Sequence, residues 1–403
     1  MQRSTFATMA VALVMVGLAG AALHNQAGNR TTRLAGARPT IDAADFTSLQ
    51  AAIDALPPAG GIVQLPAGHF VITQPLVIRS GDVCLQGAGT ATLIENKNET
   101  GQPTLLLAHP QNANNRKHEL WRIRLADFRI IGNPNSGDGI LARHINEIMI
   151  DGVTISYHGG NGIYLDHCYE DPRICDCLIT YNKKTGVQLE GCHDIVVSAC
   201  QFEENDDALQ CLDGFNLTMT GNNVDDHLGR GVVIENTYGS VVASNMIEEC
   251  ARAAIVLDRD CYGITLSANV IAHNGAGIDL RDAHGCAVSA NTLTLMAADA
   301  IRVGPESDRI AITGNSFCNS YIGGGKLRRN TTDRKAAGLV LDSTHDVAIV
   351  GNQFSSVRPK ALAVQGQHVH KVLFSNNLLT DVVTDQTKLE ASEVHDNLES
   401  DGK

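Results

Sequence analysis

The 403-residue chain has little of what several protein classes require. Charged residues make up 19% of it and aromatic residues 4%, while glycine occurs 38 times. A coiled coil or a long helical array would be richer in charge and poorer in glycine. Lys and Arg number 31 against 44 Asp and Glu, a net charge of -13. This balance argues against a nucleic-acid-binding protein, which needs a basic surface.

Zinc motifs and long apolar runs are also scarce. No two of the eleven cysteines have CxxC spacing, and Cys175 and Cys177 lie too close together for it. Only residues 7–23 are apolar enough to enter a membrane, which excludes a polytopic membrane protein. We interpret residues 1–21 as a secretory signal peptide, with an uncleaved membrane anchor as the alternative, and residues 22–44 as a linker. Either interpretation predicts a protein that is secreted, periplasmic or on the cell surface.

From Gly139 onward, the sequence repeats a small residue followed by an apolar-x-apolar pattern. Successive repeats begin 23, 24, 22, 23, 23, 23, 23, 38 and 23 residues apart. Short alternating strands at this period, with no apolar period of 3.6, predict an all-β parallel solenoid. The ten repeats begin at Gly139, Gly162, Gly186, Ala208, Gly231, Ala254, Gly277, Ala300, Gly338 and Ala361.

A series of asparagines keeps the same phase as the repeats. Stacked in register, these side chains are predicted to form an internal hydrogen-bonded ladder. Cys177 and Cys200 precede the series in the same phase and are expected to be buried thiols. Cys168 and Cys192 are also rung neighbours, and a disulfide between them is an alternative. The series comprises Asn222, Asn245, Asn269, Asn291, Asn315, Asn352 and Asn376.

Both ends of a solenoid need protection from edge-to-edge association. Residues 45–56 form the one good amphipathic helix, with Phe46, Leu49 and Ile53 on one face and Asp45 as its predicted cap. We expect this helix to cover the first rung. Residues 45–380 are predicted to form the solenoid, and residues 381–403 a polar tail.

The stretch SLQAAIDALPPAGGIVQLPAGHFVITQPLVIRSGDVCLQGAG, from Ser48 to Gly89, resembles the opening of pectate-lyase-superfamily β-helix proteins. In that superfamily a capping helix leads into a Gly-Gly turn, a P-x-G-x-[FY] strand and a G-x-G. The resemblance covers most of the chain and implies a single-stranded, right-handed parallel β-helix. It is less specific for the reaction, because the superfamily includes polysaccharide lyases, hydrolases, uronate epimerases and proteins with no known activity.

Strand alternation predicts one outward face rich in charge. In the repeat at Gly162, Ile163 and Leu165 face inward, so Tyr164 and Asp166 face outward. A stripe of carboxylates and guanidiniums suits hydrogen bonding to a sugar chain, and a solvated face of salt bridges is the alternative. The substrate-binding residues predicted on or beside this face are Asp166, Glu190, Arg230, Glu235, Asp258, Arg281 and Arg302.

Asp206 and Asp207 are the predicted catalytic residues. Asn205-Asp-Asp-Ala208 resembles, in phase, the paired aspartates of polygalacturonase-type hydrolases. The other three elements of that signature are absent, and inverting hydrolysis also needs a second carboxylate at a suitable separation. The alternative is that Asp207 forms a structural ion pair with Arg230 on the next rung.

The chain offers no definite metal or cofactor site. His158, His227 and His273 share a phase but not consecutive rungs, which argues against a metal site, and we expect exposed turn histidines. Carboxylates on adjacent rungs, such as Asp225 and Asp226, have the oxygen ligands that Ca²⁺ prefers. No EF-hand or nonapeptide calcium repeat is present, so calcium stays an open alternative.

The 38-residue spacing marks an insertion after Ser320 that carries the most basic patch of this acidic chain. Loops on a rigid scaffold often carry function, so Arg328 and Arg329 are predicted to bind an anionic glycan; an ordinary solvated loop is the alternative. The cations of the insertion are Lys326, Arg328, Arg329, Arg334 and Lys335.

Three hypotheses follow for an exported, monomeric protein whose partner is an acidic polysaccharide. The first is an enzyme of the lyase or epimerase type. The second is a non-catalytic glycan-binding or surface scaffold protein, which the incomplete catalytic signature favours. The third is a polygalacturonase-like glycoside hydrolase.

Overall fold

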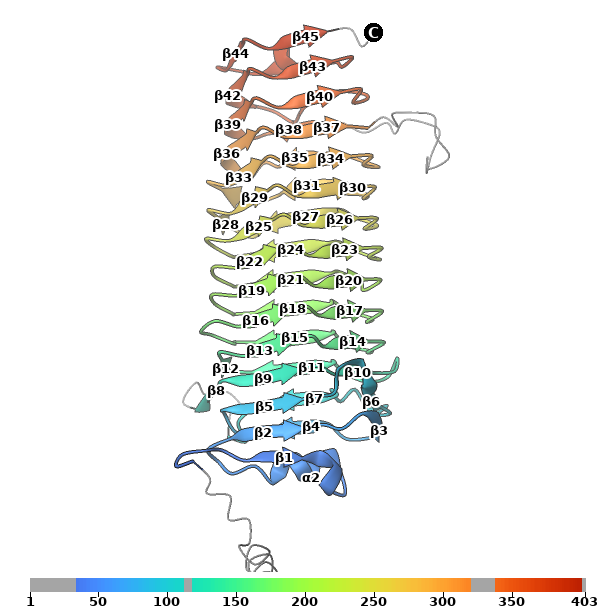
Figure 1. The fold of residues 1–403 in the computed structure, drawn as a ribbon. Helices are drawn as coiled ribbons and strands as arrows, with labels where there is room; N and C mark the ends of the chain where they lie inside the picture. The colour runs from blue at the N-terminus through green and yellow to red at the C-terminus, as the bar shows by residue number, and fades with distance from the viewer. Residues whose placement is uncertain (1–33, 112–117, 320–337, 401–403) are drawn as a thin grey trace, which may run out of the picture. The chain divides into compact units, whose positions relative to one another are not determined.

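The computed structural model describes residues 34–111, 118–319 and 338–400, and within residues 39–400 the chain winds into a parallel β-solenoid (Figure 1). Almost every rung contributes one strand to each of three sheets, A, B and C, and the strand pairs within the described residues run parallel across adjacent rungs, as between β15 and β18. Among the described residues no helix is long and apolar enough to cross a membrane. The predicted signal peptide lies outside the described residues.

Sheet C carries the outward face that concerns function. Its strands are β4 (Leu76–Ile78), β7 (Leu105–Leu107), β11 (Ile140–Arg143), β15 (Ile163–Asp166), β18 (Val187–Glu190), β21 (Leu209–Leu212), β24 (Val232–Glu235), β27 (Ala253–Asp258), β31 (Ala276–Leu280), β35 (Ile301–Val303), β38 (Leu339–Asp342) and β41 (Leu362–Gln365).

Sheet A follows sheet C along each rung. Its strands are β1 (Thr40–Asp42), β2 (Gly61–Gln64), β5 (Val83–Gln86), β9 (Ile123–Ala126), β13 (Met149–Asp151), β16 (Arg173–Cys175), β19 (Val196–Ser198), β22 (Thr218–Thr220), β25 (Val241–Ala243), β28 (Cys261–Tyr262), β29 (Thr265–Ser267), β32 (Ala283–His284), β33 (Ala287–Ser289), β36 (Asp308–Thr313), β39 (His345–Val350), β42 (His370–Ser375) and β44 (Glu393–His395).

Sheet B completes each rung, and a separate two-stranded sheet pairs β8 (Leu120–Trp121) with β12 (Ile145–Asn146). The strands of sheet B are β3 (Gly68–Ile72), β6 (Thr92–Asn96), β10 (Arg129–Ile131), β14 (Thr154–Ser156), β17 (Leu178–Thr180), β20 (Gln201–Glu203), β23 (Asn223–Asp225), β26 (Met246–Glu248), β30 (Val270–Ala272), β34 (Thr292–Thr294), β37 (Ser316–Cys318), β40 (Gln353–Ser355), β43 (Leu378–Thr380) and β45 (Leu398–Ser400).

The predicted alternation of inward and outward residues is confirmed. In β15, Ile163 and Leu165 are fully buried, while Tyr164 and Asp166 are only partly buried. The same alternation on every rung stacks apolar side chains into one continuous core. Burial of the inward apolar side chains, at about 25 cal/mol per Å² of buried area, is what holds strands of only two to six residues in place.

The N-terminal helix is shorter than predicted. Helix α2 spans Leu49–Asp54, and Ser48 caps it by accepting a hydrogen bond from the Ala51 amide at 3.1 Å. Asp45 instead belongs to the 3₁₀ turn η1 (Ala43–Asp45), so its predicted role as the cap is wrong. Phe46 is exposed because it lies before the helix, whereas Leu49 and Ile53 pack into the core as predicted.

The strands extend beyond the predicted boundaries at both ends. Strand β1 lies inside the predicted linker, residues 22–44, and pairs with β2. Strands β44 and β45 lie within the predicted polar tail, which also holds the 3₁₀ turn η4 (Gln386–Lys388); a further turn, η2 (Gly89–Ala91), precedes β6. Strand β44 pairs with β42 and β45 with β43, so the solenoid continues past residue 380. The residues of β44 and β45 are exposed, which is why no apolar pattern marks them in the sequence.

The predicted asparagine ladder is present, with one change of register. The Asn222 side chain donates to Asn245 Oδ1 at 2.9 Å and to the Val197 carbonyl at 3.1 Å, and the same pattern recurs on the following rungs. At the C-terminal end, the amide and side chain of Asn352 donate to Asn377, not to the predicted Asn376. Cys200 precedes the ladder, since its amide donates to Asn222 Oδ1.

A second internal column holds two of the histidines. The amides of His158 and Asn182 each donate to the asparagine one rung on, and the Asn205 amide donates to His227 Nδ1 at 3.2 Å. Both histidines are almost fully buried, so their predicted exposure is wrong. The physical reason is register: they occupy inward ladder positions. On a later rung Asn274, not His273, accepts the corresponding amide hydrogen bond.

All eleven cysteines are free thiols. Cys168 and Cys192 are both buried and form no disulfide, and Cys177 and Cys200 are buried as predicted. Burial raises the pKa of the Cys211 thiol to about 12. The Cys211 thiol therefore stays protonated at neutral pH and packs as a small apolar group.

Candidate functional site

Tyr164 and Glu190 lie on adjacent rungs of the outward face of sheet C. Register places Tyr164 opposite Gln188 and Asp166 opposite Glu190. The Tyr164 hydroxyl reaches diagonally and donates a hydrogen bond to Glu190 Oε2 at 2.5 Å. Partial burial and the neighbouring Glu190 carboxylate raise the pKa of Tyr164 well above its usual range. Tyr164 therefore keeps its proton at neutral pH.

Asp166 orients a histidine beside this pair. His167 Nδ1 lies 2.6 Å from Asp166 Oδ1, and Asp166 Oδ2 lies 3.5 Å from Arg143 Nε on the preceding rung. A carboxylate at Nδ1 favours the tautomer with Nδ1–H, which leaves Nε2 with a free lone pair. Tyr164 was predicted on this face, but Arg143, Tyr164 and His167 were not predicted as site residues. The signal in the sequence was the Asp-His pair at a strand end.

Gly191 leaves the space that the His167 ring occupies. A Cβ at residue 191 would lie 3.0 Å from both Cδ2 and Nε2 of His167. The backbone at Gly191 also has a φ of +59°, which glycine adopts without strain. We refer to Arg143, Tyr164, Asp166, His167 and Glu190 as the Tyr164 cluster. It combines a protonated phenol, an oriented imidazole, two carboxylates and a guanidinium.

Asp206 and Asp207, the predicted catalytic residues, lie apart from the Tyr164 cluster. Asp206 is exposed and Asp207 is buried. Asp207 is 3% exposed, and its carboxylate accepts from Arg230 Nη2 at 2.7 Å, the Arg230 amide at 2.6 Å and Gln210 Nε2 at 2.6 Å. This is the arrangement of a structural ion pair, the alternative that the sequence left open. Asp206 is exposed on the same turn. A catalytic role for either residue stays a prediction.

The remaining predicted substrate-binding residues of the face are engaged in ion pairs. Glu235 pairs with Arg259 at 3.1 Å, and Arg281 bridges Asp258 at 3.4 Å and Asp279 at 2.7 Å. Arg302 pairs with Asp342 at 2.5 Å. These contacts form a lattice of alternating charges over several rungs. Arg328 and Arg329 lie outside the described residues.

Among the residues that the structure describes, two groups of acidic and histidine side chains at the ends of sheet B strands have ligand atoms close enough to share a cation. Asp225, Asp226 and Glu249 form one group, and Glu248, Glu249 and His273 form the other. Their carboxylate oxygens suit Ca²⁺ better than a softer metal. These residues lie at a different corner of the rung from the Tyr164 cluster, because they follow sheet B rather than sheet C.

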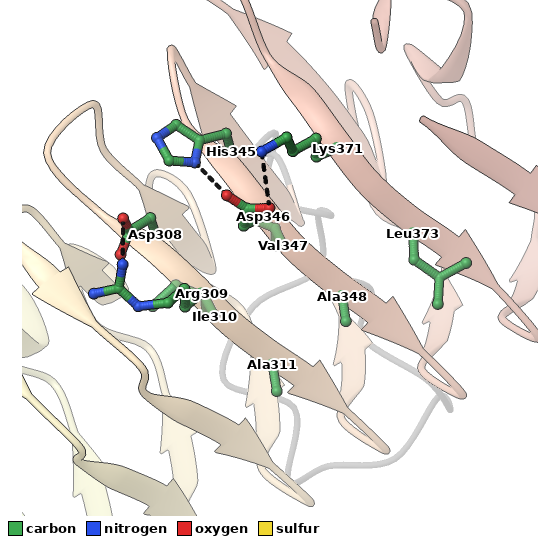
Figure 2. Close-up of a pocket in the computed structure, with 10 residues that line it drawn as sticks. All are labelled: Asp308, Arg309, Ile310, Ala311, His345, Asp346, Val347, Ala348, Lys371 and Leu373. Atoms are coloured by element: carbon green, nitrogen blue, oxygen red, sulfur yellow. Dashed lines mark hydrogen bonds and ion pairs between the residues drawn. The ribbon is translucent and has the colours of Figure 1, made fainter. Parts of the chain in front are cut away.

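The outward face of sheet A is hollowed near the C-terminal end of the solenoid. A hollow of about 630 Å³ lies over strands β36, β39 and β42. Ala311 and Ala348 form part of its floor, and Asp346 lies beside it, paired with His345 at 2.7 Å and with Lys371 at 3.7 Å (Figure 2). No residue of the Tyr164 cluster lines it, and its charged residues neutralise one another.

Comparison with known proteins identifies the architecture. A family model described as "Right handed beta helix region" matches residues 82–239, 138–293 and 254–386. No curated protein matches the sequence. The A-module of mannuronan C-5 epimerase AlgE6 from Azotobacter vinelandii superposes with a TM-score of 0.61 at 16% identity, covering 89% of this chain and 99% of that one.

Other solved structures share the fold at similarly low identity. The AlgE4 A-module from the same organism has a TM-score of 0.52 at 19% identity and covers 82% of this chain and 97% of its own. Tailspike protein 3 of bacteriophage CBA120 has a TM-score of 0.57 at 12% identity, and the match covers 89% of this chain and 61% of the tailspike chain. These likenesses establish the right-handed parallel β-helix predicted from the sequence.

Proposed function

The chain belongs to the right-handed β-helix family, and we propose that it acts on a polysaccharide containing uronate residues by moving the proton at C5, as an epimerase or a lyase does. The Tyr164 cluster is the observation that carries this proposal. Neighbours of the same fold include mannuronan and alginate epimerases, which supports a glycan substrate.

His167 is the proposed base of the reaction. Its Nδ1 faces Asp166 at 2.6 Å, so Nε2 is the nitrogen that accepts the C5 proton. The electron pair of the broken C5–H bond moves into the uronate carboxyl group, where negative charge develops. Arg143, the cation that pairs with Asp166, is the proposed partner of that charge.

Tyr164 is the proposed acid. Its raised pKa keeps it protonated, and its hydroxyl lies on the same strand face as Asp166. Delivery of its proton to the opposite face of C5 completes an epimerisation. Delivery to the leaving oxygen at C4, with cleavage of the C4–O bond, completes an elimination. Glu190, which accepts the hydrogen bond from Tyr164, holds the phenol in place.

The test is proton exchange at C5 in deuterated water, with mannuronate and galacturonate polymers as probes. Deuterium at C5 reports epimerisation, and ultraviolet absorbance from an unsaturated uronate end reports elimination. Tyr164→Phe and His167→Asn should each lower the rate by at least about 100-fold, the typical contribution of one general acid or base. Tyr157→Phe, at a different corner of the solenoid, is the matched control. Wild-type rates in both cluster variants would contradict the proposal.

A non-catalytic glycan-binding protein is the second candidate. The ion-pair lattice of Glu235, Asp258, Arg281 and Arg302 favours it, because paired charges hydrogen-bond sugars without a free acid or base. Binding of the same polymers with no exchange and no cleavage would support this candidate. We also propose that the protein works outside the cytoplasm, supported by residues 1–21 and by the likeness to a periplasmic alginate epimerase.

A further inference from the structure

Five rings contact one another on successive rungs at the turn between sheets C and A. Tyr238 and Tyr262 lie nearly parallel, at 13°, and the other neighbouring rings are inclined to one another by 58° to 73°. The centroid of Tyr169 lies 4.4 Å from that of His193, and His193 lies 4.5 Å from Phe215. Phe215 lies 5.8 Å from Tyr238, which lies 6.2 Å from Tyr262. We refer to these five residues as the ring column. Isolated parallel bridges from His193 to Tyr262 keep the column in register.

The ring column is exposed in a chain that has few aromatic residues. Phe215, Tyr238 and Tyr262 are 40%, 51% and 49% exposed, although only 4% of all residues are aromatic. The core does not use these rings, because it is filled by the inward side chains of the three sheets. An exposed aromatic side chain contributes little to folding and offers a large contact surface to a partner.

Amides and carboxylates flank the rings. Asn216 Nδ2 donates to Asp194 Oδ1 at 2.8 Å, and Asn236 Nδ2 donates to Asp213 Oδ1 at 2.6 Å, one pair on each of two neighbouring steps. These groups retain further donor and acceptor capacity toward solvent. A surface that alternates aromatic faces with amide and carboxylate groups matches a sugar ring, which has C–H groups on its faces and hydroxyls on its rim.

The ring column begins on two of the three rungs that hold the Tyr164 cluster. Tyr169 follows Asp166 by three residues, and His193 follows Glu190 by three residues. The column then climbs three more rungs along the solenoid. Because the rungs are about 4.8 Å apart, each step is comparable to the length of one pyranose ring.

We propose that the ring column is a contact platform that holds a polysaccharide along the solenoid axis, with successive pyranose rings against successive side chains of the column. The negative face of an aromatic ring attracts the weakly positive C–H groups of a sugar face. The inference deepens the proposed function, because the column would guide a chain toward the Tyr164 cluster. Binding on the column does not itself require that the cluster be catalytic.

The experiment is calorimetric titration with three hexasaccharides: β-1,4-linked mannuronate, α-1,4-linked galacturonate and β-1,4-linked glucose. All proteins carry Tyr164→Phe, so that no probe is consumed. Phe215→Ala and Tyr238→Ala should each weaken binding of the preferred hexamer by about tenfold, as loss of a central aromatic contact does. Tyr238→Phe, which keeps the ring, should bind as the parent protein does.

Tyr157→Ala is the matched control. Tyr157 is also 49% exposed and stacks on Tyr181 at 4.9 Å, but at the corner between sheets B and C. Its loss should leave binding unchanged. Unchanged binding of every hexamer in Phe215→Ala and Tyr238→Ala would overturn the proposal. The proposal would also be overturned if these variants lost only the association between copies of the chain and still bound every hexamer. If the proposed function fails, the wild-type protein, with Tyr164 intact, shows no exchange or cleavage while ring-dependent binding persists.

Discussion

Arg230 on one rung forms a two-pronged contact with Asp207 on the rung before it, through Nε at 3.1 Å and Nη2 at 2.7 Å, both to Oδ2. The Arg230 amide also donates to the other carboxylate oxygen at 2.6 Å. Removing charge from one member of a nearly buried pair leaves the other uncompensated. The pair therefore ties two rungs together at the turn that precedes sheet C.

Asp207→Asn should lower the free energy of unfolding by about 2–4 kcal/mol, because Arg230 loses its counter-charge in a mostly buried position. Asp206→Asn, on the neighbouring exposed residue, is the matched control and should change stability by less than about 0.5 kcal/mol. Denaturant titration of both variants measures the difference. Full stability of Asp207→Asn with loss of turnover would instead identify Asp207 as catalytic.

The C-terminal register of the asparagine ladder gives a second prediction. Asn377→Ala should lower stability by about 1–3 kcal/mol, because the buried Asn352 amide and side chain lose their acceptor. Asn376→Gly, on the exposed neighbour with a φ of +55°, should be close to neutral. Comparing the denaturation midpoints of the two variants checks this, and equal effects would contradict the assignment.

The asparagines also show how far the sequence predicts the fold. A period near 23 fixes which residues repeat, so the inward positions of Leu165 and Asn245 were predictable. At Asn376-Asn377 the period permits either residue, and the choice depends on which one turns the corner with a positive φ. His158 and His227 were misplaced for the same reason, because a turn offers no apolar alternation to set its phase.

The candidate site was less predictable than the fold. Asp166 and Glu190 were predicted because they are outward residues of regular strands. His167 lies just past a strand end, where a φ of +52° redirects its ring toward Asp166, and alternation does not apply there. Asp207 drew attention through a resemblance in sequence, while the repeat period also offered the ion pair with Arg230 that the structure contains.

Acid sensitivity follows from the buried histidines. Burial lowers the pKa of His158 and of His227 to about 4, so the unfolded chain binds protons more tightly than the folded one. Stability is complete above the unfolded pKa near 6.5 and is lost as the pH falls from there to about 4, by up to about 3 kcal/mol for each histidine.

His227→Asn should remove part of that loss, because the two preceding rungs carry Asn182 and Asn205 at this inward position. The variant also removes Nε2 of His227, a buried nitrogen with no hydrogen-bond partner among the described residues. Unfolding measured from pH 7.5 to pH 4 should show a shallower decline in the variant. His345→Asn, on a more exposed histidine, is the control and should keep the wild-type slope.

The corner before each ladder asparagine gives the last prediction. Gly314 has a φ of +64° there, while Ala290 holds the same corner one rung earlier with a φ of +55°. A left-handed conformation costs a non-glycine residue about 1–2 kcal/mol, partly offset by the greater freedom of glycine in the unfolded chain. Ala290→Gly should therefore raise stability by about 0.5–1 kcal/mol. Gly314→Ala should lower it by a similar amount through φ alone, because an added Cβ would meet no atom within 4 Å. Opposite shifts in the denaturation midpoints confirm the corner geometry, and shifts of the same sign contradict it.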